Sequence, residues 1–135
     1  MSFGESVRTC LNKYATFDGR ASRSEFWWFY LFTIIVTFVV YLIPFAFTLI
    51  ASAAGDNAIG TIFAILGVIG FILVFVVAIA LIIPMLAVGC RRLHDRGQSG
   101  WLQLLLLVPC GNIVLLIFWI MEGTPGENAY GPPPA

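Results

Sequence analysis

The sequence has little charge, and the charge it has is unevenly distributed. Of its 135 residues only 10% are charged and 60% are hydrophobic, with a mean hydropathy of +0.96. Soluble domains carry roughly 25% charged residues. Seven Lys and Arg residues balance seven Asp and Glu residues, so the formal net charge is zero. This composition excludes an intrinsically disordered chain and provides no strongly basic surface for nucleic acid.

Cysteine and histidine are also scarce. Cys10, Cys90 and Cys110 are odd in number and lack paired spacing, so they predict no disulfide framework. His94 is the one histidine, and we expect no cysteine or carboxylate on its helix face to complete a set of three or four metal ligands. The adjacent Asp95 should point about 100° away on a helix and could not orient the imidazole. The sequence predicts no metal, no cofactor and no catalytic residue.

Three long runs contain no charged residue: 26–55, 57–90 and 97–121. Each exceeds the ~20 residues that a helix needs to cross a bilayer. We therefore predict an all-α integral membrane protein, a single membrane domain over 1–135, with three transmembrane helices over 26–53, 58–89 and 101–121. Trp101 and Trp119 should mark the two edges of the third span, since aromatic rings favour the membrane interfaces.

Orientation follows from the basic residues, which all precede the first span or lie between the second and third. With three spans these two segments share one side of the membrane. The positive-inside rule then predicts a cytoplasmic N-terminal segment (1–21), a cytoplasmic hinge (90–100) and an external C-terminal tail (122–135). The membrane expected is a bacterial inner membrane.

The N-terminal segment has an amphipathic pattern. Its apolar residues recur at helical spacing, at Phe3, Val7, Cys10, Leu11 and Tyr14. Ser2 and Glu5 have the spacing of a capping box, which predicts a helix start. The helix could lie in the membrane interface, or it could pack on the cytoplasmic ends of the bundle; the pattern favours neither.

The hinge holds the densest polar motif. If the second helix continues to Arg96, Arg91 and Asp95 form an i,i+4 pair, Gly97 supplies a left-handed C-terminal residue and Ser99 caps the third helix. We therefore expect a structural polar hinge that consists of Asp18, Glu25, His94, Asp95, Gly97 and Ser99.

The arginines near the hinge have three interpretations. They could converge at the inner headgroup plane and bind lipid phosphate or a partner protein, in which case the binding residues are Arg20, Arg23, Arg91, Arg92 and Arg96. They could serve orientation alone, as basic loops do in any inner-membrane protein. They could also pair with Asp18, Glu25 and Asp95 and fix the N-terminal segment to the hinge.

Two further features concern helix packing. Gly60, Ala64 and Gly67 form a small-residue seam, which predicts packing within the bundle or, alternatively, self-association. Pro109, Gly111 and Asn112 lie near the middle of the third run, where a break predicts a kink or, less often, a substrate site.

Three motifs resemble domain-of-unknown-function family 805, which consists of small bacterial inner-membrane proteins. The first runs from Phe17 through Arg20 and Arg23 to Trp27, the second is the hinge from Arg91 to Trp101, and the third runs from Gly123 to Gly131. The tail departs from the family pattern at Ala129 and Pro133. The resemblance implies several membrane helices and no established biochemical activity.

These observations favour a non-enzymatic multipass inner-membrane protein whose basic cytoplasmic face contacts anionic lipid headgroups or a partner protein. One alternative is an oligomeric transporter or channel subunit, which would require a homo-oligomer because no span has a charged core. A second alternative is an enzyme that acts at the headgroup plane through His94.

Overall fold

The computed structural model describes residues 1–134, and helices dominate that part of the chain. Four are α-helices: α1 (Phe3–Asn12), α2 (Arg23–Ala54), α3 (Ala58–Asp95) and α4 (Gly111–Ile120). The fifth, η1 (Gly100–Leu107), is a 3-10 helix. Over the described residues the only β-structure is one isolated bridge. The prediction of an all-α protein is confirmed.

The helix ends follow the capping chemistry of the sequence. The Ser2 hydroxyl accepts a hydrogen bond from the Glu5 N–H, and the Glu5 carboxylate accepts one from the Ser2 N–H, which is the predicted capping box. Ser22 accepts from the Glu25 N–H in the same way at the start of α2, at 3.2 Å. Gly97, with φ of +75°, ends α3 in the left-handed region, as predicted.

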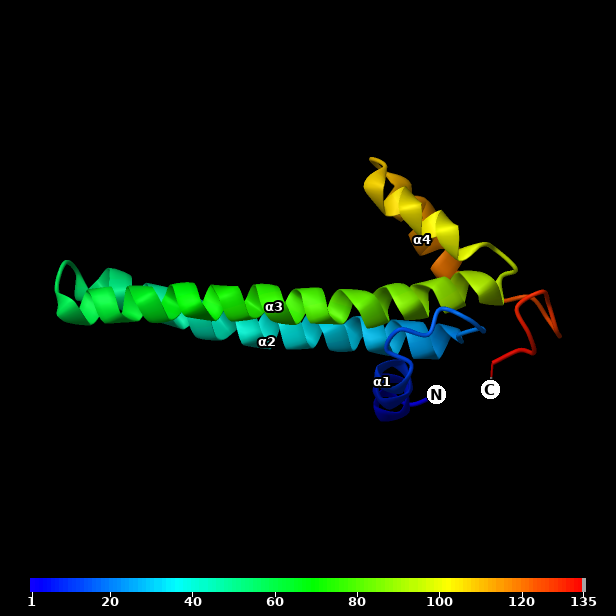
Figure 1. Ribbon diagram of the computed structural model, residues 1–135, viewed down its shortest axis with the longest axis horizontal. Helices are drawn as coiled ribbons and strands as arrows, with labels where there is room; N and C mark the ends of the chain where they lie inside the picture. The colour runs from blue at the N-terminus through cyan, green and yellow to red at the C-terminus, as the bar shows by residue number, and fades with distance from the viewer. Residues whose placement is uncertain (135) are drawn as a thin grey trace. The chain divides into compact units, whose positions relative to one another are not determined.

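The chain forms two compact units. The hairpin unit comprises Phe32–Leu81, and the terminal unit comprises Met1–Leu31 together with the chain from Ile82 onward. Within the hairpin unit α2 and α3 run side by side (Figure 1). A Cβ atom on Gly70 would lie 2.7 Å from Cβ of Pro44, so the two helices approach too closely there for a larger residue.

The three residues of the predicted small-residue seam have different surroundings in the structure. Gly67 faces α2, because a Cβ atom there would lie 3.1 Å from the Thr48 hydroxyl oxygen. Gly60 instead packs against the connection between the helices, where a Cβ atom would overlap the Gly55 carbonyl, and Ala64 is exposed. Gly67 therefore serves packing within the chain, and the three residues do not form one continuous face.

Two helices, α2 and α3, are long and apolar enough to cross a membrane, and they contain the first two predicted spans. With 38 residues, α3 is about 57 Å long at 1.5 Å per residue, well beyond a hydrocarbon core of about 30 Å. The length of α3 therefore exceeds what a single crossing requires. Residues 90–95 of the predicted hinge form the last turns of this helix.

The prediction of one continuous helix over 101–121 is wrong. The run instead forms η1, a turn at Val108–Cys110, and then α4, and the chain reverses at the turn (Figure 1). Cys110 has a left-handed backbone with φ of 65°, and a Cβ atom on Gly111 would overlap the Leu105 carbonyl. Pro109 is thus part of a turn between two short helices and does not kink a continuous one. With 10 residues, α4 is about 15 Å long, half the thickness of a hydrocarbon core.

The aromatic marker that supported a third span also has another role. Trp119 is buried in the terminal unit, where its ring centroid lies 4.8 Å from that of Phe26. Its indole N–H donates to the Gly89 carbonyl at 3.3 Å. Trp119 therefore attaches α4 to α2 and α3, and of the two predicted edge residues Trp101 alone is exposed as an interfacial ring would be.

Candidate functional site

The polar residues of the hinge and the N-terminal segment meet inside the terminal unit. We call the five charged side chains at their centre the buried ion-pair cluster; they are Arg20, Glu25, Arg91, Arg92 and Asp95. All five are buried, and Arg91 and Arg92 are 0% exposed. Charged groups are almost never fully buried unless they are paired, so the contacts of each one identify what the cluster does.

Arg91 joins α3 to α2. Its Nη1 donates to the carboxylate of Glu25, and both side chains are almost completely buried. The same carboxylate lies 3.8 Å from the thiol of Cys10, which belongs to α1. The Nε and Nη2 groups of Arg91 are buried and have no hydrogen-bond partner among the described residues. Arg91 of α3 therefore makes one charged contact, with Glu25 of α2. The Cys10 thiol of α1 lies beside the same carboxylate, so residues of three helices meet at this point.

Arg92 uses its guanidinium far more fully. Its Nη1 donates to the Asp95 carboxylate, and its Nη2 donates to the Met121 carbonyl. Its Nε donates to the Trp119 carbonyl at 3.1 Å. Met121 and Trp119 lie at the end of α4, where carbonyls have no partner within the helix. Arg92 therefore caps the C-terminus of α4.

Arg20 fixes the loop before α2 to the C-terminal tail. Its Nε donates to Oδ1 of Asp95 at 2.9 Å, and its Nη2 donates to the Thr124 carbonyl at 2.6 Å. Its Nη1 donates to the Gly126 carbonyl at 2.6 Å. Asp95 thus accepts from Arg20 and Arg92 together, and its own backbone carbonyl accepts from the Thr124 N–H at 2.7 Å.

The predicted i,i+4 pair between Arg91 and Asp95 does not form. Adjacent residues on a helix point about 100° apart, so Arg91 faces Glu25 while Arg92 faces the same neighbours as Asp95. Asp95 pairs with Arg92 at i,i+3 and with Arg20 from the N-terminal loop. These contacts agree with the hypothesis that Glu25 and Asp95 pair with arginines inside the protein. Asp18 makes no ion pair among residues 1–134.

The tail contacts the hinge along much of its length. Besides the bonds to Arg20, the Asn128 side chain donates to the His94 carbonyl at 3.0 Å, and Arg96 donates to the Glu122 carbonyl at 2.9 Å. These contacts place the tail beside the hinge, whereas the predicted topology separates the two by the membrane. The physical reason is the turn at Val108–Cys110, which returns the chain to the hinge.

Four basic residues remain outside the buried ion-pair cluster. Arg8 of α1 and Lys13, the residue after α1, are exposed, as is Arg23 at the start of α2, and Arg96 is partly exposed. Arg23 lies 3.7 Å from the Glu122 carboxylate, but both side chains are more than half exposed. An exposed pair of this kind contributes between zero and about 1 kcal/mol. Its charges are therefore accessible to other partners.

The amphipathic segment forms α1, which packs on the start of α2 through one face. Ser6 and Cys10 are buried, and the Ser6 hydroxyl donates to the Ser24 carbonyl at 3.4 Å. Burial, together with the nearby Glu25 carboxylate, raises the pKa of the Cys10 thiol to about 12. Leu11 stays exposed, so α1 contacts the bundle and still presents an apolar edge.

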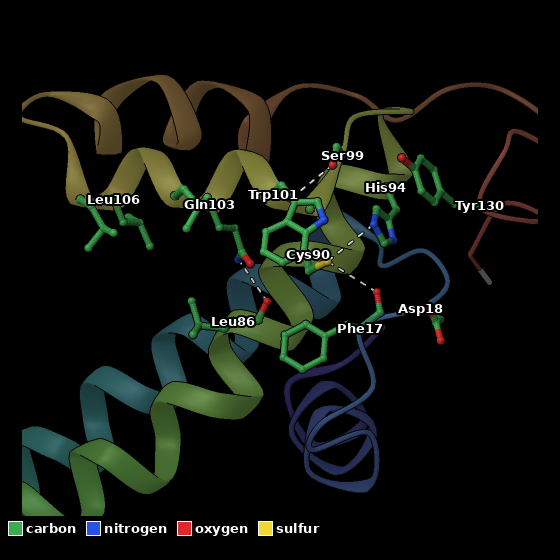
Figure 2. A pocket seen from close by; sticks show the side chains of 13 residues that line it. Phe17, Asp18, Leu86, Cys90, His94, Ser99, Trp101, Gln103, Leu106 and Tyr130 are labelled. Carbon is green, nitrogen blue, oxygen red and sulfur yellow. Dashed lines mark hydrogen bonds between the residues drawn. The ribbon is translucent and has the colours of Figure 1, made fainter.

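His94 lies among the hinge, the N-terminal loop and the tail. Its Nδ1 is 3.0 Å from the Gly19 carbonyl, and its ring stacks on Tyr130 with centroids 3.9 Å apart. Its Nε2 lies 3.6 Å from the Cys90 thiol, one helical turn earlier (Figure 2). The expectation that no cysteine shares the face of His94 is therefore wrong, and the i,i+4 spacing of the two residues was the signal. The described residues contain no group of three metal-ligating side chains.

Beside His94 lies a cavity of about 830 Å³ that the sequence did not predict. Its walls come from the loop before α2, the last turns of α3, η1 and the tail (Figure 2). The Gln103 amide donates to the Leu86 carbonyl at 3.1 Å and connects η1 to α3 at one wall. Ser99 caps η1 as predicted, accepting from the Trp101 N–H at 3.3 Å.

The fold and the buried ion-pair cluster define a helical membrane protein. Its N-terminal loop, the end of α3 and its C-terminal tail meet around buried charged side chains. Residues 14–132 match the family model described as protein of unknown function (DUF805), and the chain belongs to this family. It is similar to the inner membrane protein YhaH of Escherichia coli (strain K12), with 38% identity over 125 residues that cover 92% of this chain and 91% of the relative.

The chain is also similar to the inner membrane protein YhaI of the same strain, with 37% identity over 92% of this chain and 90% of the relative. No solved structure matches. These relatives support an inner-membrane location and transmembrane helices, and they confirm the family resemblance.

Proposed function

We propose that the chain is a non-enzymatic inner-membrane protein that crosses the bilayer twice, through α2 and α3, and dips into it once through η1 and α4. In this topology the N-terminal segment, the hinge and the tail share the cytoplasmic side. Support comes from the hydrogen bonds between the tail and the hinge and from the length of α4, which is too short to cross.

The charge distribution agrees with this topology. All seven Lys and Arg residues lie before or at the start of α2, or at or just after the end of α3, so none is assigned to the outside. The connection Gly55–Asn57 would be the external loop, and it contains one charged residue, Asp56. This is the bias that the positive-inside rule describes. The rule counts only basic residues, so assigning the acidic tail to the cytoplasmic side does not conflict with it.

The proposed activity of this cytoplasmic face is contact with anionic lipid headgroups. The observation that carries the proposal is the division of the basic residues into two sets. Arg20, Arg91 and Arg92 are buried in internal contacts, whereas Arg8, Lys13 and Arg23 are exposed beside the first membrane helix. Basic side chains beside an anionic surface contribute about 1 kcal/mol each.

The exposed apolar edge of α1 strengthens the argument. A helix with basic residues and an exposed Leu11 next to a membrane helix can rest against the headgroup region while its other face packs on α2. The lipid contact is therefore assigned to Arg8, Lys13 and Arg23, with Arg96 as a partly buried neighbour. This set replaces Arg20, Arg91 and Arg92, whose donors are directed into the protein.

The test compares retention of phosphatidylglycerol and phosphatidylcholine by native mass spectrometry. Joint replacement of Arg8, Lys13 and Arg23 by Gln should reduce retained phosphatidylglycerol, by up to about fivefold per residue. High salt should weaken retention by the wild type as well. Glu127→Gln, which changes one exposed charge in the tail, is the matched control and should retain the anionic lipid. Unchanged retention by the triple variant would refute the proposal.

A further inference from the structure

The cavity beside His94 takes no part in the proposed contact with anionic lipid. Its volume of about 830 Å³ lies within the range of roughly 300–1,000 Å³ typical of small-molecule sites. Every residue that lines it belongs to the terminal unit. The chemistry of the walls therefore identifies the class of molecule that would fit.

One part of the wall is hydrocarbon. Leu86 of α3 faces the cavity together with Leu104 and Leu107 of η1, and no charged residue separates them. Leu104 and Leu107 are largely exposed, so this part of the cavity is open to its surroundings. In an inner-membrane protein, an open leucine-lined wall suits a lipid chain, because burial of apolar surface is the main source of affinity.

The other part of the wall is acidic and aromatic. Asp18 lines the cavity and makes no ion pair within residues 1–134, and the aromatic rings of Phe17, Trp101 and Tyr130 line it as well. Figure 2 shows Phe17, Leu86 and Trp101 around the Cys90 thiol. Aromatic faces and a carboxylate are the groups that attract an ammonium ion.

His94 and Cys90, which also line the cavity, already have partners. His94 contacts the Gly19 carbonyl and stacks on Tyr130, and the Cys90 thiol lies 3.5 Å from the Phe17 carbonyl. No Lys or Arg lines the cavity, so it offers no charged group for phosphate. Asp18 is therefore the charge that selects the ligand, and it selects a cation.

We infer that this cavity binds a membrane lipid with a primary ammonium headgroup, of the phosphatidylethanolamine class. One acyl chain lies along Leu86, Leu104 and Leu107, and the ammonium group lies beside Asp18 and the aromatic rings. The lipid phosphate faces away from the cavity. This inference goes beyond the proposed function, since it concerns a different headgroup and different residues.

The experiment measures lipid retained by the full chain, purified from an equimolar mixture of phosphatidylethanolamine and phosphatidylglycerol, by native mass spectrometry. The comparison uses the variant in which Arg8, Lys13 and Arg23 are all replaced by Gln, because this variant lacks the proposed phosphatidylglycerol contact. It should retain one phosphatidylethanolamine in preference to phosphatidylglycerol. Asp18→Asn should reduce this preference about two- to fivefold, as expected for the loss of one partly exposed charge contact. The larger side chain in Leu86→Trp should occupy the cavity beside its apolar wall and abolish retention of the lipid.

Two control variants lie in the hairpin unit. Asp56→Asn removes an exposed carboxylate away from the cavity, and Leu73→Trp adds the same indole at an exposed position of α3. Both should retain phosphatidylethanolamine as the wild type does. Asp18 is exposed, so its replacement tests the inference even if Leu86→Trp does not fold.

Three results would overturn the inference. Equal retention of the two lipids by the variant that lacks Arg8, Lys13 and Arg23 would mean that bulk lipid fills the cavity. An unchanged preference in Asp18→Asn would remove the ammonium contact. Displacement of the lipid by an excess of free ethanolamine would assign the site to a soluble amine. Unchanged phosphatidylglycerol retention by the Arg8, Lys13 and Arg23 variant would instead refute the proposed function and leave the inference about the cavity standing.

Discussion

Arg20 and Asp95 are separated by 75 residues, yet Nε of the arginine lies 2.9 Å from Oδ1 of the aspartate. Arg20 belongs to the loop before α2, and Asp95 is the last residue of α3. Both side chains are buried, and the same arginine reaches the Thr124 carbonyl in the tail. This single contact therefore joins the N-terminal loop, the end of α3 and the C-terminal tail.

Replacing Arg20 by Gln should destabilise the terminal unit. The change leaves the Asp95 carboxylate with Arg92 alone and removes the donors to the tail carbonyls. Breaking a buried pair by removal of one partner typically costs about 3–5 kcal/mol. Thermal unfolding in mild detergent, followed by circular dichroism, should show a lower midpoint than the wild type. Arg8→Gln, at an exposed position, should unfold as the wild type does.

Arg91 and Arg92 should respond differently to replacement by Lys. Within residues 1–134 the Arg91 guanidinium donates to the Glu25 carboxylate, a contact that an ammonium group can replace. Arg92 donates to Asp95, Trp119 and Met121 through three different nitrogens, and the compact ammonium of Lys cannot reproduce that fork. We expect Arg92→Lys to lower the unfolding midpoint clearly more than Arg91→Lys. Equal effects would mean that the fork geometry of Arg92 contributes nothing beyond its charge.

Much of this architecture could be predicted from the sequence, because its signals are local. The two long helices follow from uncharged runs, the capping box from Ser2 and Glu5, and the left-handed end of α3 from Gly97. Each depends on residues within a few positions of one another. The Cys90 and His94 contact was equally local, and its i,i+4 spacing made it predictable.

The tail and the turn before α4 could not be predicted in the same way. The run 97–121 has the length and hydropathy of a span, and only the left-handed Cys110 and the close approach of Gly111 to Leu105 make it reverse. The partners of Arg20 lie more than 70 residues away in the chain. Helical periodicity gives no information on contacts between residues so far apart in the chain. The sequence alone therefore allowed these arginines to be assigned to a surface that binds lipid, although the structure buries them.

The proposed topology predicts a cytoplasmic C-terminus. A fluorescent reporter that matures only in the cytoplasm, fused after Ala135, should be bright, and alkaline phosphatase at the same position should be inactive. The same reporters inserted in the loop Gly55–Asn57 should give the reverse pattern. Active phosphatase after Ala135 would require α4 and η1 to cross the membrane together, against the hydrogen bonds between the tail and His94.

The Cys10 thiol should resist alkylation in the folded protein. Its pKa is raised to about 12, so at pH 9 almost all of it is the unreactive thiol. A chain with Cys10 as its one cysteine should react with iodoacetamide far more slowly when native than when unfolded. Because the folded pKa is the higher one, stability from this group is complete below about pH 8.5 and declines as pH rises from there toward 12. Native labelling with a midpoint near pH 9 would contradict the burial of Cys10.

Gly123 should be essential for the attachment of the tail, because a Cβ atom there would overlap the Asp95 carboxylate that receives Arg20 and Arg92. Gly123→Ala must either displace this carboxylate from its two arginines or move the tail away from the end of α3. Gly4→Ala is the matched control, since a Cβ atom on Gly4 meets nothing within 4 Å, and in α1 it should be neutral or slightly stabilising. Limited proteolysis should cleave the tail of Gly123→Ala faster than that of Gly4→Ala. Equal cleavage would mean that the tail tolerates a side chain against Asp95, and the contact between tail and hinge would then be looser than the hydrogen bonds of Thr124 indicate.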